Sequence, residues 1–254
     1  MLKVRLIPSL LLRNGRCVKG VSFNNHRDVG NPITAAKVYE AQGADELLFL
    51  DIDATDGGRK ALLRIVTQTA EQCFMPLTVG GGIRSVTDMR TLLRVGADKI
   101  AINSAAFERP ALIKEGADEF GSQCIVVSID HVTGKNDGVG TVITKNGTNK
   151  TDTSVVDWAV EVEDLGAGEI LLTSIDHDGR RNGYATDTVR AVSDAVNIPV
   201  IASGGAGELN DFVLAITKGH ASAVAAASLF HFTDQSVIKV HSFMKQAGLD
   251  VRIS

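Results

Sequence analysis

One stretch of this sequence occurs twice, and the repeat limits the folds open to the chain more than any other feature. Residues 76–84 (PLTVGGGIR) and residues 199–207 (PVIASGGAG) each form a short apolar run that breaks into glycines. The tetrapeptide GADE at residues 43–46 likewise returns as GAGE at residues 166–169, and each of these pairs lies 123 positions apart. The second half of the chain is therefore a version of the first.

Short apolar runs rich in β-branched residues alternate with segments of helical spacing. The predicted strands are residues 4–11, 46–53, 76–83, 99–104, 124–130, 169–176, 199–203 and 222–230. The predicted helices are residues 32–42, 59–72, 86–95, 110–120, 155–165, 185–196, 208–217 and 235–247. This alternation indicates an α/β fold with a parallel sheet covered by helices. Strand number alone also permits an open doubly wound sheet, but two copies of a four-(βα) unit close naturally into an eight-stranded barrel. We therefore expect residues 1–254 to form one domain, a single (βα)8 TIM barrel built from two half-barrel repeats.

Residues 133–150 interrupt the alternation. The β-prone run at residues 141–144 is followed by the turn sequence Lys145-Asn146-Gly147. This pattern predicts a hairpin inserted after the fifth strand, with a disordered loop as the alternative. An excursion at this rim of a barrel usually serves binding rather than stability.

The composition favours a small ligand over a polymer or a membrane. Charged residues make up 22% of the chain and the formal net charge is −4, so neither a nucleic-acid-binding surface nor a polybasic membrane patch is expected. No apolar run approaches the ~20 residues of a membrane span, and the N-terminus lacks a signal-peptide layout, so we expect a cytoplasmic protein. The three cysteines and six histidines show no metal-ligand spacing. No disulfide framework, metal or cofactor is therefore expected.

Acidic residues lie at the ends of three predicted strands. Asp51 and Asp53 end the second, Asp130 ends the fifth, and Asp176 and Asp178 lie at and just beyond the end of the sixth. In a barrel these positions face the mouth, where a carboxylate can act as a general acid or base. The alternative for each is a structural role, such as capping the following helix. Asp130 is the strongest catalytic candidate because it ends an apolar run at the depth where a side chain enters the pocket.

The duplicated glycine turns predict two phosphate sites. Consecutive glycines at the end of a strand leave backbone N–H groups open to close approach by a phosphate. Asn103-Ser104 ends the fourth predicted strand and Ala227-Ser228 ends the eighth, so each turn has a neighbouring strand that can supply polar donors. For either glycine pair alone, a tight strand exit is the alternative. Lys19, in a predicted loop after the first strand, could close over a phosphate as a mobile cation or remain a solvated surface lysine.

Four charged residues begin predicted strands at the opposite end of the barrel. They are two cations and two anions, namely Arg5, Glu46, Lys99 and Glu169. A charge-paired plug that stabilises the barrel floor is the simpler interpretation. The alternative is a gate through which a small molecule enters from below.

Four motifs together resemble the cyclase subunit of imidazole glycerol phosphate synthase. They are LTVGGGIR at residues 77–84, GSQCIVVSID at 121–130, GAGEILLTSID at 166–176 and IASGGAG at 201–207. The resemblance runs from Arg5 to Arg252. It implies a half-barrel duplication and a bisphosphorylated aminoimidazole-carboxamide ribonucleotide as substrate. It also implies a glutaminase subunit, a class I amidotransferase, that docks at the N-terminal face of the barrel and sends ammonia up through it.

The resemblance also implies roles for individual residues. Asp130 matches one of the family's two catalytic aspartates, which act as acid and base. Lys19 matches the lysine of a mobile loop. The residues that match substrate and phosphate positions are Gly82, Asn103 and Ser104 at one site, Asp178, Gly179, Gly205, Ala227 and Ser228 at the other, and Thr173 and Ser203 in the pocket between them. The quartet Arg5, Glu46, Lys99 and Glu169 matches the family's ammonia gate, which favours the gate over the plug.

The sequence departs from the family pattern on the first strand. Alignment of Ser9-Leu10-Leu11 with Ser128-Ile129-Asp130 places Leu11 where the second catalytic aspartate is expected, and a leucine cannot transfer a proton. Loss of one member of an acid/base pair commonly costs about 10² to 10⁴ in rate. Asp53 also replaces an expected uncharged residue.

Both changes resemble a paralogue found with surface-polysaccharide gene sets, in which the barrel passes ammonia to a sugar-modifying amidotransferase as a further partner. We therefore expect a specialised paralogue with impaired cyclase chemistry. The alternatives are an ordinary histidine-pathway cyclase, which forms imidazole glycerol phosphate and an aminoimidazole carboxamide ribonucleotide, and a non-catalytic ammonia-conducting scaffold. The isomerase of the neighbouring step is a weaker alternative, because it too needs an acid at the end of the first strand.

Overall fold

The apolar runs of the two halves form parallel strands that close on themselves. The computed structural model describes residues 3–53, 56–134 and 139–252. The barrel strands in chain order are β1 (Arg5–Arg13), β4 (Leu47–Asp51), β5 (Leu77–Gly80), β6 (Lys99–Ile102), β7 (Ile125–Val132), β10 (Glu169–Ser174), β11 (Val200–Ser203) and β12 (Ala223–Ala226). Parallel pairing runs from β10 through β11, β12, β1, β4, β5 and β6 to β7, and β7 pairs with β10 to close the ring. The predicted single (βα)8 barrel is confirmed.

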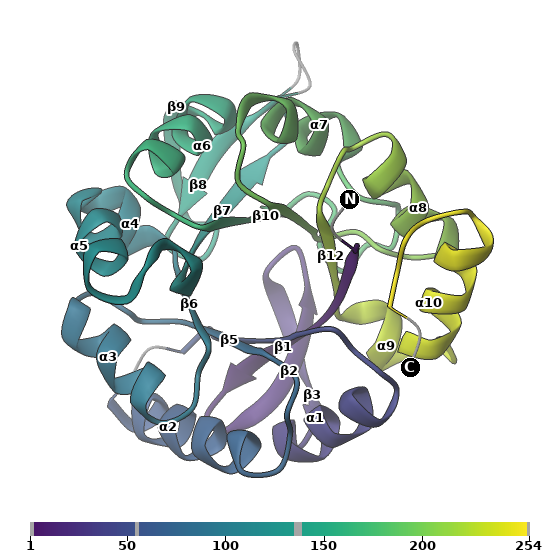
Figure 1. The fold of residues 1–254 in the computed structure, drawn as a ribbon, viewed down its shortest axis with the longest axis horizontal. Coiled ribbons are helices and arrows are strands. Elements are labelled where there is room, and N and C mark those ends of the chain that lie inside the picture. The colour runs from purple at the N-terminus through teal and green to yellow at the C-terminus, as the bar shows by residue number, and fades with distance from the viewer. Residues whose placement is uncertain (1–2, 54–55, 135–138, 253–254) are drawn as a thin grey trace.

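Helices form the outer layer around this ring (Figure 1). They are α1 (Pro32–Ala41), α2 (Asp56–Ala70), α3 (Val86–Arg94), α5 (Ala111–Phe120), α6 (Val155–Asp164), α7 (Thr186–Ala195), α8 (Leu209–Thr217) and α10 (Val237–Gln246). Local sequence sets several of their starts. Asn31 caps α1 by accepting from Ile33 N and Thr34 N, and Ser85 accepts from Asp88 N at the start of α3. No helix in the described part of the chain is long and apolar enough to cross a membrane.

Three short helical segments were not predicted. They are α4 (Ser104–Glu108), η1 (Ser122–Cys124) and α9 (Ser228–Phe232). The predicted strands at residues 99–104 and 222–230 extended into the segments that form α4 and α9. These two helices follow β6 and β12, which hold equivalent places in the two half-barrels, and each turns the chain at the barrel mouth.

Each half-barrel carries an antiparallel hairpin after its first strand. The hairpin after β7, formed by β8 (Thr141–Thr144) and β9 (Asn149–Ser154), was predicted; residues 135–138 within that segment lie outside the described residues. The hairpin after β1, formed by β2 (Arg16–Val21) and β3 (Asn24–Gly30), was predicted as a loop, and that prediction was wrong. The repeat contained the missing signal, because β1 and β7 are equivalent strands.

The barrel interior is layered along its axis. Outward-facing residues such as Leu6, Leu10 and Phe49 pack against the helices. Inside the ring, an apolar layer lies above the charged N-terminal end and below the polar C-terminal end. It comprises Ile7, Leu48, Ala101, Val126, Leu171, Ile201, Ala223 and Ala225. The polar side chains are thus confined to the two ends of the barrel, and the larger cavity lies at the C-terminal end.

Candidate functional site

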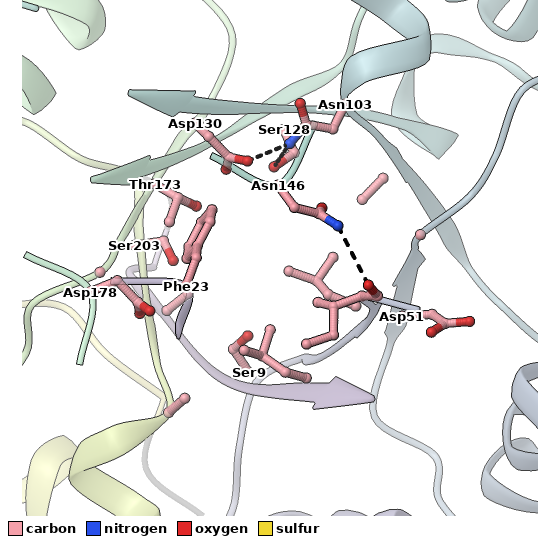
Figure 2. A pocket seen from close by; sticks show the side chains of 18 of the residues that line it. Ser9, Phe23, Asp51, Asn103, Ser128, Asp130, Asn146, Thr173, Asp178 and Ser203 are labelled. Carbon is pink, nitrogen blue, oxygen red and sulfur yellow. Dashed lines mark hydrogen bonds between the residues drawn. The ribbon is translucent and has the colours of Figure 1, made fainter. Parts of the chain in front are cut away.

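A cavity of about 730 Å³ opens at the C-terminal ends of the barrel strands. Every barrel strand, or the loop that follows it, contributes to its lining. Figure 2 shows Asp130, Asn103 and Ser128 together on one side of this space and Ser9 on the other, with Thr173, Ser203 and Asp178 between. The cavity therefore brings together most of the residues that the sequence singled out.

Asp130 points into the cavity from β7 and is held by a neighbouring amide. Its Oδ2 accepts a hydrogen bond from Asn103 Nδ2 at 2.8 Å, and the same nitrogen lies 3.5 Å from Ser128 Oγ. Burial raises the pKa of Asp130 to about 7; the bond from Asn103 opposes this rise and the charge of Asp178 adds to it. A carboxyl group with this pKa can both donate and accept a proton near neutral pH. Its catalytic role stays a prediction.

The glycine turns after β5 and β11 each contain a residue with a positive φ angle and little space for a side chain. Gly81 and Gly205 have φ values of +113° and +117°. A Cβ atom would lie 2.2 Å from Asp51 O at Gly81 and 2.0 Å from Gly183 O at Gly205. Close backbone approach is thus sufficient to explain these two glycines, whatever ligand the turns bind. Gly82 lines the cavity, and its carbonyl oxygen accepts a hydrogen bond from Arg59.

The polar neighbours of the two turns are arranged differently. Ser104 begins α4, and its hydroxyl accepts a hydrogen bond from Lys145 N at 2.8 Å. Asn103 is directed to Asp130 as described above. Ala227 lines the cavity just before α9, and Ser228, the first residue of that helix, has a buried hydroxyl with no hydrogen-bond partner among the described residues. The Ser228 hydroxyl is therefore a buried polar group without a partner in the described part of the chain.

Lys19 lies on strand β2, and the prediction of a loop position was wrong. Its side chain is buried, and its Nζ lies 2.6 and 2.9 Å from the two carboxylate oxygens of Asp178. Gly179 permits this contact, because a Cβ there would lie 2.4 Å from Gly20 O. Thr173 and Ser203 are register partners on β10 and β11, and both line the cavity nearby.

Not every predicted acid faces the cavity. Asp51 does, and burial raises its pKa. Asp176 instead accepts a hydrogen bond from Thr133 N at 2.7 Å and ties the end of β10 to the loop after β7. Neither Asp176 nor Asp53 lines the cavity. The expectation that all five acids face the cavity mouth is therefore not met: Asp51, Asp130 and Asp178 line the cavity, and Asp53 and Asp176 do not.

The tips of the two hairpins meet over the cavity, which sequence reasoning did not anticipate. Phe23 at the β2–β3 turn and Asn146 at the β8–β9 turn both line it. A Cβ on Gly147 would lie 3.3 Å from the Phe23 ring, and Asn146 Nδ2 donates to Ile52 O at 3.4 Å. The Lys145-Asn146-Gly147 turn was visible in the sequence, but nothing in the sequence indicated that its tip reaches across the barrel.

The four charged residues at the N-terminal end form a closed ring of ion pairs. Arg5 pairs with Glu46 at 2.7 Å and also with Glu169. Lys99 Nζ lies 2.8 Å from Glu46 and 2.9 Å from Glu169. Glu46 is only 2% exposed and also accepts from Thr78 Oγ1 at 2.5 Å. The predicted meeting of these four side chains is confirmed, whereas their role as a gate is not tested by this geometry.

No group of three or more metal-ligating side chains occurs within the described ranges. With a pKa raised to about 7, the carboxyl group of Asp130 is suited to proton transfer near neutral pH.

Comparison with known proteins identifies the family. The family described as histidine biosynthesis protein matches residues 5–236. The chain belongs to this histidine biosynthesis protein family. It is also similar to the imidazole glycerol phosphate synthase subunit HisF of Caulobacter vibrioides strains NA1000 / CB15N and ATCC 19089 / CIP 103742 / CB 15. Identity with each is 52% over 254 residues, which span 100% of this chain and 97% of the relative. The predicted resemblance to the cyclase-subunit family is confirmed, and the specialised paralogue is not distinguished from it.

Within this histidine biosynthesis barrel, Leu11 lies across the cavity from Asp130. Its side chain lines the cavity from β1, in register with Leu50 on β4. Strands β1 and β7 are four places apart in the closed ring of eight, so they face each other. The wall opposite Asp130 therefore presents an apolar side chain where the repeat predicts a second acid.

Proposed function

We propose that this protein is a cyclase-family subunit that receives ammonia from a glutaminase and has lost most of its own cyclase activity. Residues 1–254 act as one barrel domain in this proposal. The ammonia serves the amidation of a sugar in surface-polysaccharide synthesis, with a sugar amidotransferase as the acceptor enzyme. The observation that carries the proposal is Leu11 on the cavity wall opposite Asp130.

The chemical argument rests on the pair of acids that ring closure needs. One group has to give a proton while another takes one, and the two have to reach the substrate from different sides. Asp130 is suited to either task because its pKa is raised to about 7. Leu11 supplies no partner, and the loss of one proton-transfer group costs about 10² to 10⁴ in rate.

The N-terminal face has features suited to a docked glutaminase. The ring of Arg5, Glu46, Lys99 and Glu169 opens to this face, with 26% of Arg5 and 21% of Lys99 exposed. Phe74, in the loop before β5, is 91% exposed on the same face. A phenyl ring left in water on this face is the kind of aromatic anchor that a partner subunit buries. Ammonia released by such a partner would enter at the ring.

The cavity suits a bisphosphorylated ligand even without efficient turnover. The turns at Gly82 and Gly205 follow β5 and β11, which are four places apart in the ring of eight, and Ser228, whose hydroxyl has no partner within the described residues, follows the neighbouring strand β12. In this proposal Gly82, Asn103 and Ser104 hold one phosphate. Asp178, Gly179, Gly205, Ala227 and Ser228, with Lys19, hold the other.

The test is an assay of the purified barrel with the bisphosphorylated ribonucleotide and ammonium salt. We expect turnover by the natural protein to be about 10²-fold or more below that of the Leu11→Asp variant, because the aspartate restores the second acid. Leu11→Asn is the matched control, since it adds polarity without an ionisable group. Turnover by the natural protein equal to that of Leu11→Asp would overturn the proposal.

The ordinary histidine-pathway cyclase is the second candidate, and the 52% identity to HisF favours it. The same assay separates the two, since this candidate requires efficient turnover with Leu11 in place.

A non-catalytic scaffold is the third candidate. It requires that Asp130→Asn leave product formation by the full complex unchanged, while Lys99→Ala uncouples glutamine hydrolysis from amination. Loss of product in Asp130→Asn would rule out this third candidate.

A further inference from the structure

The β1 wall of the cavity changes character from its depth to its mouth. Ser9, Leu11 and Arg13 are alternate residues of β1, and all three line the cavity. Ser9 is buried, Leu11 is half-buried and Arg13 at the end of the strand is exposed. This wall therefore offers a hydroxyl group, an apolar side chain and a cation, with no acid among them.

The positive charge of Arg13 is uncompensated. Within the described residues it forms no ion pair, and its Nη2 lies 3.5 Å from Nδ1 of His26. The other cation that lines this part of the cavity, Lys19, is paired with Asp178. Arg16, opposite Arg13 in the hairpin, is paired with Asp28 at 2.8 Å. Within the described residues, Arg13 is thus the cavity-lining cation of this wall that has no acid partner.

His26 adds a second donor beside the guanidinium group. It lies on β3 and lines the same cavity. An arginine only donates hydrogen bonds, so Nδ1 of His26 faces it as an acceptor and the neutral ring carries its proton on Nε2. Burial and the positive charges of Arg13 and Lys19 lower the pKa of His26, against the opposing charge of Asp178. The ring therefore stays neutral and offers an N–H group to an anion.

Because residue 11 is a leucine, Arg13 and His26 have no acid beside them on this face of β1. An acid at position 11 would lie on the same face of the strand, about 7 Å along it from Arg13, and would offset part of the charge. We propose that Arg13 and His26 form an anion subsite at the β1 wall, which takes a carboxylate or phosphate group of the ligand and is separate from the two glycine turns. The planar fork of an arginine matches the oxygen geometry of either group.

The test follows nuclear magnetic resonance signals of the full-length protein during titration with inorganic phosphate and, separately, with acetate. The ring signal of His26, identified with a His26→Asn variant, reports on the proposed subsite, and the amide of Gly205 reports on the second glycine turn. The natural protein is compared with Arg13→Gln, with the charge-conserving Arg13→Lys, and with Arg94→Gln as a control at an exposed arginine of α3.

We expect a saturable shift of the His26 signal with one or both anions, and the anion that gives it identifies the chemistry of the ligand group. The dissociation constant at His26 should rise about tenfold or more in Arg13→Gln, less in Arg13→Lys and not at all in Arg94→Gln. The Gly205 signal should respond alike in all four proteins. An absence of saturation with both anions, or equal affinity at His26 in Arg13→Gln, would overturn the subsite. A response at His26 with none at Gly205 would support the subsite and count against the proposed phosphate site at the turn.

Discussion

The carboxyl group of Asp130 lies in an environment that favours its protonated form. Burial is the main cause of its pKa of about 7, compared with an ordinary value of 3.8, and Asp178 contributes in the same direction. Asn103 donates to the ionised form and limits the rise. At the residue scale, the cavity has therefore one acid whose protonation changes near neutral pH and, across from it, a leucine that does not titrate.

The raised pKa predicts how stability depends on pH. Between about pH 4 and pH 7 the folded protein keeps a proton on Asp130 that the unfolded chain releases, so stability falls as pH rises through this window. The drop in the free energy of unfolding between about pH 5 and pH 8 should be smaller in Asp130→Asn by about 1 to 3 kcal/mol. Urea denaturation at the two pH values measures it. Asp164→Asn at an exposed position of α6 is the control, and an unchanged profile in Asp130→Asn would contradict the buried, protonated state.

At the scale of elements, the two half-barrels place equivalent pieces at the cavity mouth. A glycine turn follows both β5 and β11, a short helix follows both β6 and β12, and a hairpin follows both β1 and β7. The hairpins close over the cavity from opposite strands, with Phe23 against the Gly147 turn. Gly81 and Gly205 in these turns can take no side chain, because the neighbouring backbone occupies the space.

Substitution of Gly205 by alanine should lower the free energy of unfolding for two reasons that can be measured separately. Gly205 has a positive φ, and a Cβ there would also collide with Gly183 O; Gly248 has a φ of +87° with nothing within 4 Å. Gly248→Ala should therefore cost about 1 kcal/mol for the backbone conformation alone, and Gly205→Ala about 3 kcal/mol or more. Denaturant unfolding of both variants checks the difference. Equal losses of stability in the two variants would mean that the turn shifts easily and that the close backbone approach at Gly205 adds nothing to the loss.

For the whole molecule, the barrel separates two polar ends by an apolar layer. The floor holds two cations and two anions in mutual contact, and its charges balance. The buried Glu46 receives hydrogen bonds from three different side chains, Arg5, Lys99 and Thr78. Such a ring joins β1, β4, β6 and β10, so strands distant in sequence depend on one another at this end.

Removing one charge from the floor should be more harmful than removing a balanced pair. Lys99→Met leaves two carboxylates with Arg5 as their remaining cation, and we expect a loss of about 1 to 3 kcal/mol, reduced from the buried limit because Lys99 is partly exposed. The double variant Lys99→Met with Glu169→Gln restores neutrality and should recover part of that loss. A double-mutant cycle in urea measures the coupling. Additive effects of the two changes would show that the ring is not energetically connected.

The amino-acid pattern was sufficient to predict the architecture and one important position in the cavity. The period of apolar residues indicates which faces are buried, and the repeat requires two equivalent halves, so the closed barrel and the equivalence of Leu11 to Asp130 followed from the sequence. The predicted strands at residues 46–53, 76–83 and 222–230 extend beyond the ends of β4, β5 and β12. The apolar pattern does not distinguish the end of a strand from the tight turn that follows it.

The identity of the side chains that meet at the cavity mouth became clear from the three-dimensional structure. Lys19 and Asp178 are separated by 159 positions, and their contact depends on a hairpin whose second strand, β3, is polar and carries no apolar alternation. The bond from Thr133 to Asp176, the bond from Asn103 to Asp130 and the uncompensated charge of Arg13 likewise depend on where the loops lie after the ring closes. The local pattern of apolar residues indicates which side chains are buried. Contacts at the cavity mouth depend instead on closure of the barrel, which brings the ends of distant strands within the length of a side chain.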